Sequence, residues 1–380
     1  MGMLDGKVAI VTGAGRGIGR GIARQMAAEG AAVVVNDLGT ALSGEGVDVS
    51  VAQQVVDEIR AEGGSAVANT DSVADYRAAE AMVQQAIDAF GRLDIVVNCA
   101  GILRDRMIFN MTPEEWQAVL DVHLKGTFNL CKWASVRFRE QKSGRLINMT
   151  SNSAFGAPGQ PNYAAAKAGI IGLTLSCANG LARYNVTANA VVPSGATRMI
   201  DSIPSAREAV AHTGKLPSEL AAGTEKDPDN VAPLVTYLAS DAAQHISGHL
   251  FGSFGYNVVL FSQPKIIKTL RADHRWTVEE LAQHIPQAFG SDFQEVVNDP
   301  RVSAAIEAIP EGKWVEIGPG LRFFGTKIEP HMEFVWSGVG PHPRPLSQPW
   351  ERGGGRSTKH AVRGSGTALR SPSPRVGRGG

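Results

Sequence analysis

The sequence predicts an α/β fold in which a doubly wound parallel sheet carries helices on both faces, followed by a small C-terminal extension. Three observations support this prediction. Short apolar runs of strand length alternate with segments of helical periodicity, a pattern typical of parallel sheets with right-handed crossovers. A glycine-rich turn follows the first apolar run, and an acidic residue, Asp37, ends the second. In such sheets, ligands bind at the carboxyl ends of the strands.

The expected elements follow one another in regular order. Strands are expected at Lys7 to Val11, Ala32 to Asn36, Ser65 to Ala68, Ile95 to Asn98, Arg145 to Met149, Thr187 to Val192 and, as the last strand, around Leu250 to Leu260. Thr112-Pro113-Glu114-Glu115 predicts a helix start, because it combines an N-cap, a first-turn proline and the glutamate of a capping box. Asp227-Pro228 repeats the cap and proline. Further helices are predicted from Trp276 and over Pro300 to Ala308.

A glycine-rich segment directly follows the first expected strand. It runs Thr12-Gly13-Ala14-Gly15-Arg16-Gly17-Ile18-Gly19 and precedes a helical pattern from Arg20 to Glu29. Glycines let a backbone turn tightly and approach a pyrophosphate, whose charge then lies against the N-terminal amides of the following helix. Asp37 lies 18 residues beyond Gly19, where its carboxylate can accept hydrogen bonds from an adenosine ribose. A glycine cluster alone is often only a tight turn, but the glycines and the acid together favour a dinucleotide site.

The pentapeptide Tyr163-Ala-Ala-Ala-Lys167 is a candidate acid/base unit. Residues four apart on a helix are neighbours on one face, so we expect the Lys167 ammonium beside the Tyr163 phenol. A nearby cation favours the phenolate and should lower the pKa of Tyr163 from its usual value of about 10. Such pairs are common on solvated helices, and it is the nucleotide signature upstream that favours chemistry here.

These motifs resemble those of the short-chain dehydrogenases/reductases, a family with the Rossmann fold. The resemblance covers roughly residues 4 to 262 and rests on the glycine spacing, on Asn98-Cys99-Ala100-Gly101 and on the Tyr163/Lys167 pair. Within the family, three segments are most similar to the (3R)-hydroxyacyl-CoA dehydrogenase domain of peroxisomal multifunctional enzymes and its bacterial relatives. They are Val33 to Gly39, Gly101 to Asp105 and Val122 to Gly126.

The resemblance implies a catalytic set of Ser151, Tyr163, Lys167 and His123. The family's serine usually lies 13 residues before the tyrosine, where this chain has Thr150, so Ser151 requires a one-residue deletion between Asn152 and Gln160. Ser153 is a further candidate for the catalytic hydroxyl. His123 replaces an asparagine that normally holds water linked to the lysine; it is expected to do the same, or to be an ordinary core residue.

The resemblance also implies the cofactor contacts. They are expected from Gly13, Arg16, Gly17, Ile18, Gly19, Asp37, Asp71, Ser72, Asn98, Ala100, Gly101, Tyr163, Lys167, Pro193 and Ala196. NAD is expected rather than NADP, because Asp37 would repel a 2′-phosphate. Arg16 alone hints at the opposite preference, and one arginine without a second base near Asp37 is more often a solvated loop residue.

Composition limits the remaining possibilities. Residues 337–380 carry seven Arg and one Lys against one Glu, which leaves 29 basic and 36 acidic side chains in the other 336 residues. This mildly acidic body has no basic footprint for nucleic acid.

Cys99, Cys131 and Cys177 lack metal-ligand spacing and are expected to be buried thiols. With no signal peptide and no apolar run near the ~20 residues of a membrane span, we expect a cytoplasmic protein without membrane partners.

Three regions are expected along the chain. They are a dinucleotide-binding catalytic domain over 1–262, a C-terminal extension over 263–336, and a disordered tail over 337–380, where 16 of 44 residues are Gly or Pro. The composition of that tail also fits readthrough or a frameshifted end. Ser194 to Lys226, which has few periodic residues, is long enough to act as a substrate-binding lid.

The sequence therefore predicts an NAD-dependent oxidoreductase that transfers hydride between a secondary alcohol and nicotinamide, with a 3-hydroxyacyl-CoA as the substrate that the resemblance favours. Family resemblance also implies a small-molecule substrate and a homodimer or homotetramer. The alternatives are a general alcohol or ketone oxidoreductase acting on steroids, sugars or polyketide intermediates, and a non-catalytic dinucleotide-binding regulator. The regulator predicts loss of Tyr163, Lys167 or the nearby hydroxyls, and all are present.

Overall fold

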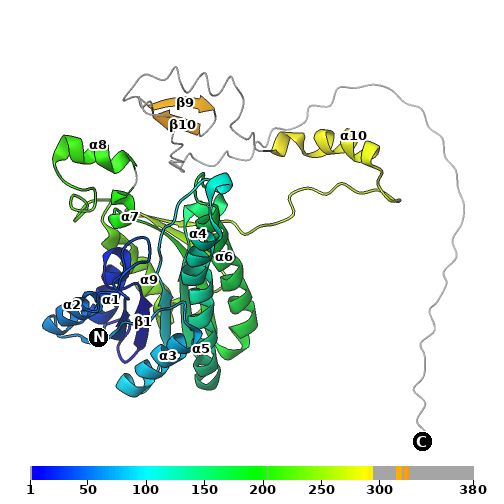
Figure 1. The fold of residues 1–380 in the computed structure, drawn as a ribbon. Coiled ribbons are helices and arrows are strands. Elements are labelled where there is room, and N and C mark those ends of the chain that lie inside the picture. Colours follow the sequence, from blue (N-terminus) through cyan, green and yellow to red (C-terminus); the bar gives the residue numbers. More distant parts are fainter. Residues whose placement is uncertain (1, 203, 294–313, 319–320, 325–380) are drawn as a thin grey trace, which may run out of the picture. The chain divides into compact units, whose positions relative to one another are not determined.

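The computed structural model describes residues 2–202, 204–293, 314–318 and 321–324 (Figure 1). Residues 1–291 form one compact unit, and residues from 292 onward belong to a second. In the second unit, strands β9 (Trp314–Gly318) and β10 (Leu321–Phe324) pair antiparallel. The helix expected over Pro300 to Ala308 and the tail expected from residue 337 lie outside the described residues.

The first unit is built on a sheet with the strand order β3-β2-β1-β4-β5-β6-β7-β8. Its strands are β1 Val8–Thr12, β2 Ala32–Asn36, β3 Ser65–Asn69, β4 Ile95–Asn98, β5 Gly144–Met149, β6 Val186–Ser194, β7 Leu250–Phe254 and β8 Asn257–Leu260. All neighbours pair parallel except β7 and β8. The chain winds outward from β1 to β3 and then returns to β4 on the other side of β1, which is the doubly wound arrangement that the sequence predicts.

The first six expected strands are found, with bounds shifted by two residues at most. The expectation of a single last strand around Leu250 to Leu260 is wrong. The chain turns at Gly255, which has φ of 58°, and forms an antiparallel hairpin in which Phe254 pairs with Asn257. Because leucine and phenylalanine stand on both sides of this glycine, the turn is hidden in an apolar run.

Helices cover both faces of the sheet, as Figure 1 shows. The helices of this unit are α1 Gly17–Ala28, α2 Ser50–Ala61, α3 Tyr76–Phe90, α4 Pro113–Leu120, α5 Gly126–Gln141, α6 Pro161–Leu181, α7 Arg198–Asp201, α8 Pro204–Thr213, α9 Ala232–Ala239 and α10 Val278–Phe289. Side chains alternate between the faces of a strand, so β1 contributes to two cores. Ala9 and Val11 pack with α1, α2 and α9, whereas Val8 and Ile10 pack with α3, α5 and α6.

The predicted helix starts are present in the described part. Thr112 and Glu115 form a reciprocal capping box at α4, in which Thr112 Oγ1 accepts from the Glu115 N–H at 3.2 Å. A second capping box, at Thr277, begins α10. The cap at Asp227 leads first into a 3-10 turn, Pro228–Val231, which continues into α9. The expected lid, Ser194 to Lys226, contains α7 and α8.

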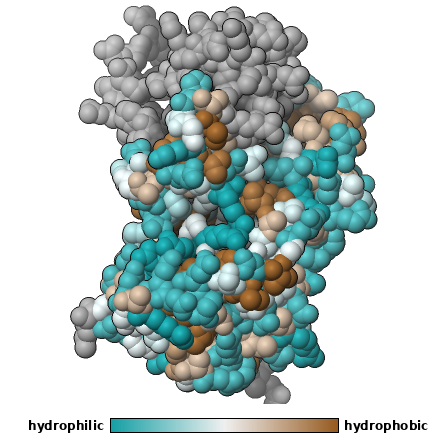
Figure 2. Space-filling view, turned by 60° about the vertical axis from the view of Figure 1, so that its left-hand side comes forward, coloured by the Kyte–Doolittle hydropathy of each residue, from teal (hydrophilic) through white to brown (hydrophobic). Residues whose placement is uncertain are grey.

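One described helical segment, Pro161–Tyr184, is long and apolar enough to cross a membrane. It comprises α6 and the 3-10 turn after it. In this fold α6 packs against β5 and β6 and contacts α4 and α5, as expected of the inner helix of an α/β layer. The face shown in Figure 2 is mostly hydrophilic, with separate apolar patches.

Candidate active site

A cavity of about 700 Å³ lies at the carboxyl ends of the central strands. Its walls come from the glycine turn after β1, the loops after β2 and β4, helix α6 and the lid segment. Most of the predicted site residues line it, namely Gly13, Arg16, Gly17, Ile18, Gly19, Asp37, Asp71, Ser72, Ala100, Gly101, His123, Tyr163, Lys167, Pro193 and Ala196. The fold therefore brings residues as far apart in the chain as Gly13 and Ala196 into one site.

Two predicted residues lie behind the wall of this cavity. The buried Asn98 side chain donates to Asn148 Oδ1 at 2.8 Å and so links β4 to β5. Ser151 is also absent from the lining and reaches the site through Tyr163. Asn98 therefore supports the strand ends from behind, which differs from the direct cofactor contact that we expected.

The glycine turn is packed too tightly to admit side chains. A Cβ atom on Gly13, which has φ of 64°, would lie 2.7 Å from Ala100 Cα, and one on Gly19 would lie 2.1 Å from the Gly13 carbonyl oxygen. The hydroxyl of Thr12 accepts from the N–H groups of Cys99 and Ala100 at 3.0 and 3.1 Å. Helix α1 begins here without a side-chain cap. Its first amides lie along the cavity and fit the diphosphate of a dinucleotide.

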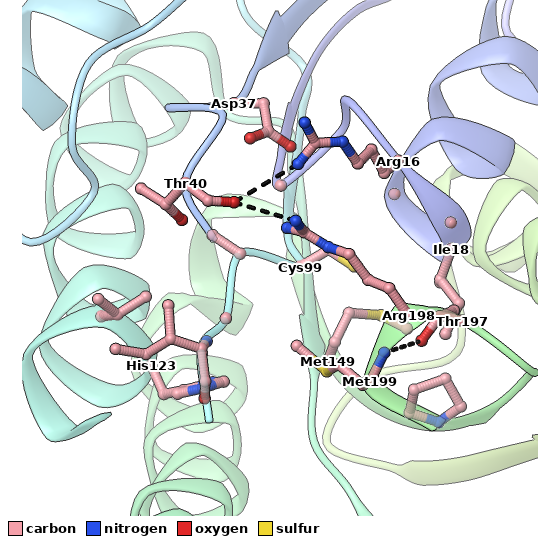
Figure 3. Close-up of a pocket in the computed structure, with 18 of the residues that line it drawn as sticks. Arg16, Ile18, Asp37, Thr40, Cys99, His123, Met149, Thr197, Arg198 and Met199 are labelled. Atoms are coloured by element: carbon pink, nitrogen blue, oxygen red, sulfur yellow. Dashed lines mark hydrogen bonds between the residues drawn. The ribbon is translucent and has the colours of Figure 1, made fainter. Parts of the chain in front are cut away.

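The loop after β2 places a carboxylate beside this turn. Asp37 accepts from the Gly15 N–H at 2.9 Å and from the Gly39 N–H at 2.7 Å. The Thr40 carbonyl accepts from two guanidiniums, Arg16 Nη1 at 3.4 Å and Arg198 Nη1 at 3.0 Å (Figure 3).

A second base therefore does lie near Asp37, which corrects our expectation that Arg16 has no basic neighbour. Burial lowers the pKa of Arg198, and the charge of Arg16 lowers it further. The negative charge of Asp37 acts against both effects and raises that pKa. Sequence reasoning missed Arg198. The one available signal was its position directly after the turn from Pro193 to Thr197.

Helix α6 places Tyr163 and Lys167 at the other end of the cavity. Lys167 Nζ lies 5.5 Å from the centroid of the Tyr163 ring and donates to the Met149 carbonyl at 2.8 Å. Burial raises the pKa of Tyr163 to about 12 and lowers the pKa of Lys167 to about 8. Our expectation that Lys167 sets the phenol pKa is therefore not met. Desolvation prevails, because both groups lose water in the same wall of the cavity.

Three hydroxyls near Tyr163 have different partners. Ser151 lies close enough to the phenol to oppose the rise of its pKa. The Thr150 hydroxyl donates instead to the Lys167 carbonyl at 2.8 Å, and the Ser153 hydroxyl donates to Gln160 Oε1 at 2.9 Å. Of these three hydroxyls, only that of Ser151 thus acts on the pKa of the phenol, even though Ser151 stands one residue closer to Tyr163 than the family spacing.

A polar chain continues from Ser151 to the rim of the site. The Ser153 N–H donates to Ser151 Oγ at 3.2 Å, and Gln160 Nε2 donates to Asp105 Oδ2 at 2.7 Å. Asp105 also raises the pKa of Tyr163 through its charge, while desolvation of the Asp105 carboxyl raises its own pKa. The sequence showed no pattern that would single out Gln160.

His123 is buried in a π-helical turn, Asp121–Lys125, between α4 and α5. Its Nε2 lies 3.0 Å from the Ile102 nitrogen and 2.8 Å from the Ile102 oxygen, and its ring meets the Tyr163 ring edge-on at 5.0 Å. Burial, and then Lys167, lower the pKa of His123 to about 3, so the ring is neutral. Within the described residues Nδ1 has no hydrogen-bond partner, which fits the water-holding role that we expected.

Comparison with known proteins adds an independent line of information. A family profile described as short chain dehydrogenase matches residues 7–208. A short-chain type dehydrogenase/reductase of Mycobacterium tuberculosis is 43% identical over 283 residues, which are 71% of this chain and 92% of the relative. Hydroxyacyl-CoA dehydrogenase ChsB1 of the same organism is 41% identical over 75% of this chain and 89% of its own length.

Two further similarities concern a larger protein and a solved structure. The peroxisomal multifunctional enzyme type 2 of Drosophila melanogaster is 44% identical over 253 residues, and the chain covers 40% of that enzyme. The crystal structure of a short chain dehydrogenase from Mycobacterium avium superposes with a TM-score of 0.65 at 40% identity. The superposition covers 76% of this chain and 96% of the Mycobacterium avium chain.

Proposed function

Because this chain belongs to the short-chain dehydrogenase/reductase family, we propose that it is an NAD-dependent oxidoreductase acting on the hydroxyl of a 3-hydroxyacyl-CoA or a closely related secondary alcohol. The observation that carries this proposal is the arrangement of the cavity. A glycine cradle and Asp37 lie at one end, and the Ser151, Tyr163 and Lys167 cluster lies at the other.

The acid/base chemistry belongs to Tyr163. In oxidation its phenolate oxygen takes the hydroxyl proton of the alcohol, and in reduction its phenol returns a proton to the carbonyl oxygen. Ser151 donates a hydrogen bond to the reacting oxygen and holds it beside the phenol. Lys167, whose Nζ lies 5.5 Å from the centroid of the Tyr163 ring, stabilises the negative charge that forms on the phenol during oxidation, although it does not offset the desolvation that raises the resting pKa of the phenol. The nicotinamide ring, when bound, accepts or supplies the hydride.

Removal of the phenol oxygen tests this assignment. Tyr163→Phe should lower kcat by 10²- to 10⁴-fold, the usual contribution of a general acid/base, while the Kd for the dinucleotide stays within about threefold. Stopped-flow turnover and a fluorescence titration measure the two quantities. Activity within threefold of the parent would assign proton transfer to another residue.

The preference for NAD is supported by Asp37, whose carboxylate lies where an adenosine ribose would be held. Both Arg16 and Arg198 donate to the Thr40 carbonyl in the same loop, so NADP binding depends on whether a 2′-phosphate reaches these cations or is repelled first by Asp37. We propose that Asp37 prevails for NAD. The ratio of kcat/KM for NAD to that for NADP should exceed one in the parent and fall in Asp37→Ala. An NADP preference in the parent would contradict the proposal.

The thioester substrate is supported by the relatives named hydroxyacyl-CoA dehydrogenase and peroxisomal multifunctional enzyme. Formation of NADH from (3R)- and (3S)-hydroxyacyl-CoA should be compared with its formation from free secondary alcohols, including steroid and sugar alcohols. We expect the 3R thioester to give the highest kcat/KM. A preference for the free alcohols or for the 3S isomer would refute the thioester while leaving the dehydrogenase assignment intact.

A further inference from the structure

Resting on the proposed dinucleotide function, we propose that Arg16 and Arg198 together form a phosphate clamp that binds the diphosphate of the dinucleotide and so fastens the lid over it. Arg16 belongs to the glycine turn, whereas Arg198 begins α7 in the lid segment. In Figure 3 the Arg198 side chain crosses from Thr197 toward Thr40, where its guanidinium lies beside that of Arg16.

The two guanidiniums have an excess of unused donors. Each carries five N–H groups, and among the described residues each gives one hydrogen bond, to the same Thr40 carbonyl. In the described part of the chain, neither guanidinium has a carboxylate oxygen within 4.0 Å. Both residues are partly buried and line the cavity. The remaining donors are therefore available to a ligand in that cavity.

The juxtaposition of two cations is unfavourable without an anion. Like charges that converge on one neutral carbonyl repel each other, and partial burial reduces the screening by water. In the described part of the chain, the carboxylate of Asp37 interacts electrostatically with Arg198, and that of Asp48 with Arg16. Asp37 accepts from two backbone N–H groups, and Asp48 accepts from the Ser50 N–H and hydroxyl. A bound phosphate would supply the missing negative charge.

The position of the clamp favours the diphosphate over a 2′-phosphate. Thr197, which precedes Arg198, lies against the start of α1, because a Cβ atom on Gly17 would be 3.0 Å from Thr197 Cγ2. The Arg198 side chain therefore runs from beside the N-terminus of α1, where a diphosphate would lie, to the Thr40 carbonyl. Bidentate contacts of guanidiniums with phosphate oxygens are strong and directional, so the bound diphosphate would hold the lid closed.

Calorimetric titration of the 380-residue chain tests this proposal without catalysis. The ligands are ADP-ribose, NAD, NADP and adenosine, which carries no phosphate. The variants are Arg198→Met, Arg198→Lys and Arg16→Met. Arg183→Met is the matched control, since Arg183 is an exposed guanidinium over the Tyr184 ring. Thermal melting of each variant verifies that it is folded.

We expect Arg198→Met to raise the Kd for ADP-ribose and NAD by roughly tenfold to a hundredfold, the range for lost charge-assisted hydrogen bonds. Arg198→Lys should lose less, and adenosine should bind within twofold of the parent. The dependence of the Kd on salt should become weaker in Arg198→Met and remain unchanged in Arg183→Met.

Three results would overturn the clamp. The first is unchanged ADP-ribose binding in Arg198→Met. The second is a loss of affinity confined to NADP, which would assign the arginines to a 2′-phosphate. The third is an equal loss of affinity for adenosine, which would make the role of the arginines purely structural. A parent protein that binds none of the dinucleotides would refute the proposed function itself. The clamp alone is refuted when the parent binds the dinucleotides and Arg198→Met binds them equally well, so the two failures can be told apart.

Discussion

Burial controls the charges of the candidate active site. Tyr163 is driven toward its neutral form, with a pKa of about 12, and Lys167 and His123 are driven the same way, with pKa values of about 8 and about 3. Desolvation of this kind penalises any charged form. The residue types and their spacing were readable from the sequence, whereas the depth at which each group lies depends on how α4, α5 and α6 pack, which no local pattern records.

Two neighbours of Tyr163 should shift the pH dependence of oxidation in opposite directions. Oxidation needs the phenolate, so kcat/KM should rise with pH below the pKa of Tyr163. Ser151 lowers that pKa and Asp105 raises it. Ser151→Ala should therefore move the profile to higher pH, and Asp105→Asn, which keeps an acceptor for Gln160, should move it to lower pH. Initial rates between pH 6 and pH 10 measure both shifts, and displacement of the two profiles in the same direction would contradict this account.

His123 should make the protein less stable in acid. Its pKa falls from 6.5 in the unfolded chain to about 3 in the fold, so between these values the unfolded state binds the extra proton. The free energy of unfolding should then decrease as the pH falls from 6.5, by roughly 2 kcal/mol at pH 5. His123→Asn removes this contribution, and the exposed His245→Asn is the control. Urea denaturation at the two pH values measures the difference, and equal slopes in parent and His123→Asn would disprove it.

At the scale of elements, the turn between β1 and α1 is the most constrained part of the site. Gly19 lies where a Cβ atom would meet the Gly13 carbonyl, whereas Gly172, in the middle of α6, has no heavy atom within 4 Å of such a Cβ. Both glycines lie in helices. Their different surroundings allow a matched pair of substitutions.

Gly19→Ala should widen the glycine turn and lower the free energy of unfolding by about 1–3 kcal/mol, the usual cost of overpacking, and it should weaken ADP-ribose binding. Gly172→Ala should raise the free energy of unfolding by about 0.5–1 kcal/mol, because alanine favours helix, and leave binding unchanged. Denaturant melts and titrations measure these effects. If Gly19→Ala bound ADP-ribose as the parent does, the turn would not be the phosphate cradle.

Most of the strands and helices were predictable from the sequence. Apolar runs bounded by turn residues marked β1 to β6, and the capping residues at Thr112 and Thr277 marked two helix starts. The β7–β8 hairpin was missed, because one glycine inside an apolar run does not distinguish a turn from a strand interior. Arg198 was missed, because its partner Thr40 is 158 residues away and the segment around it has no periodicity.

At the scale of the molecule, one unit contains the whole candidate site. The sheet from β1 to β8, both large cores and every residue that lines the cavity lie within residues 1–291. A chain that ends at Ser291 should therefore melt within a few degrees of the 380-residue chain and bind ADP-ribose with a Kd within twofold of its value. Calorimetry measures both, and loss of binding on truncation would show that later residues contribute to the site.

The return of the chain to β1 has a consequence for synthesis on the ribosome. One edge of β1 pairs with β2, which follows within 30 residues. The other edge pairs with β4, which begins only at Ile95. At 5–20 residues per second, this second edge stays open for on the order of 10 s. An apolar strand with an open edge is a template for pairing with another chain. The nascent protein therefore passes through an interval in which an interior strand of its sheet has one unpaired edge, and chaperone binding would matter most before residue 98 has emerged.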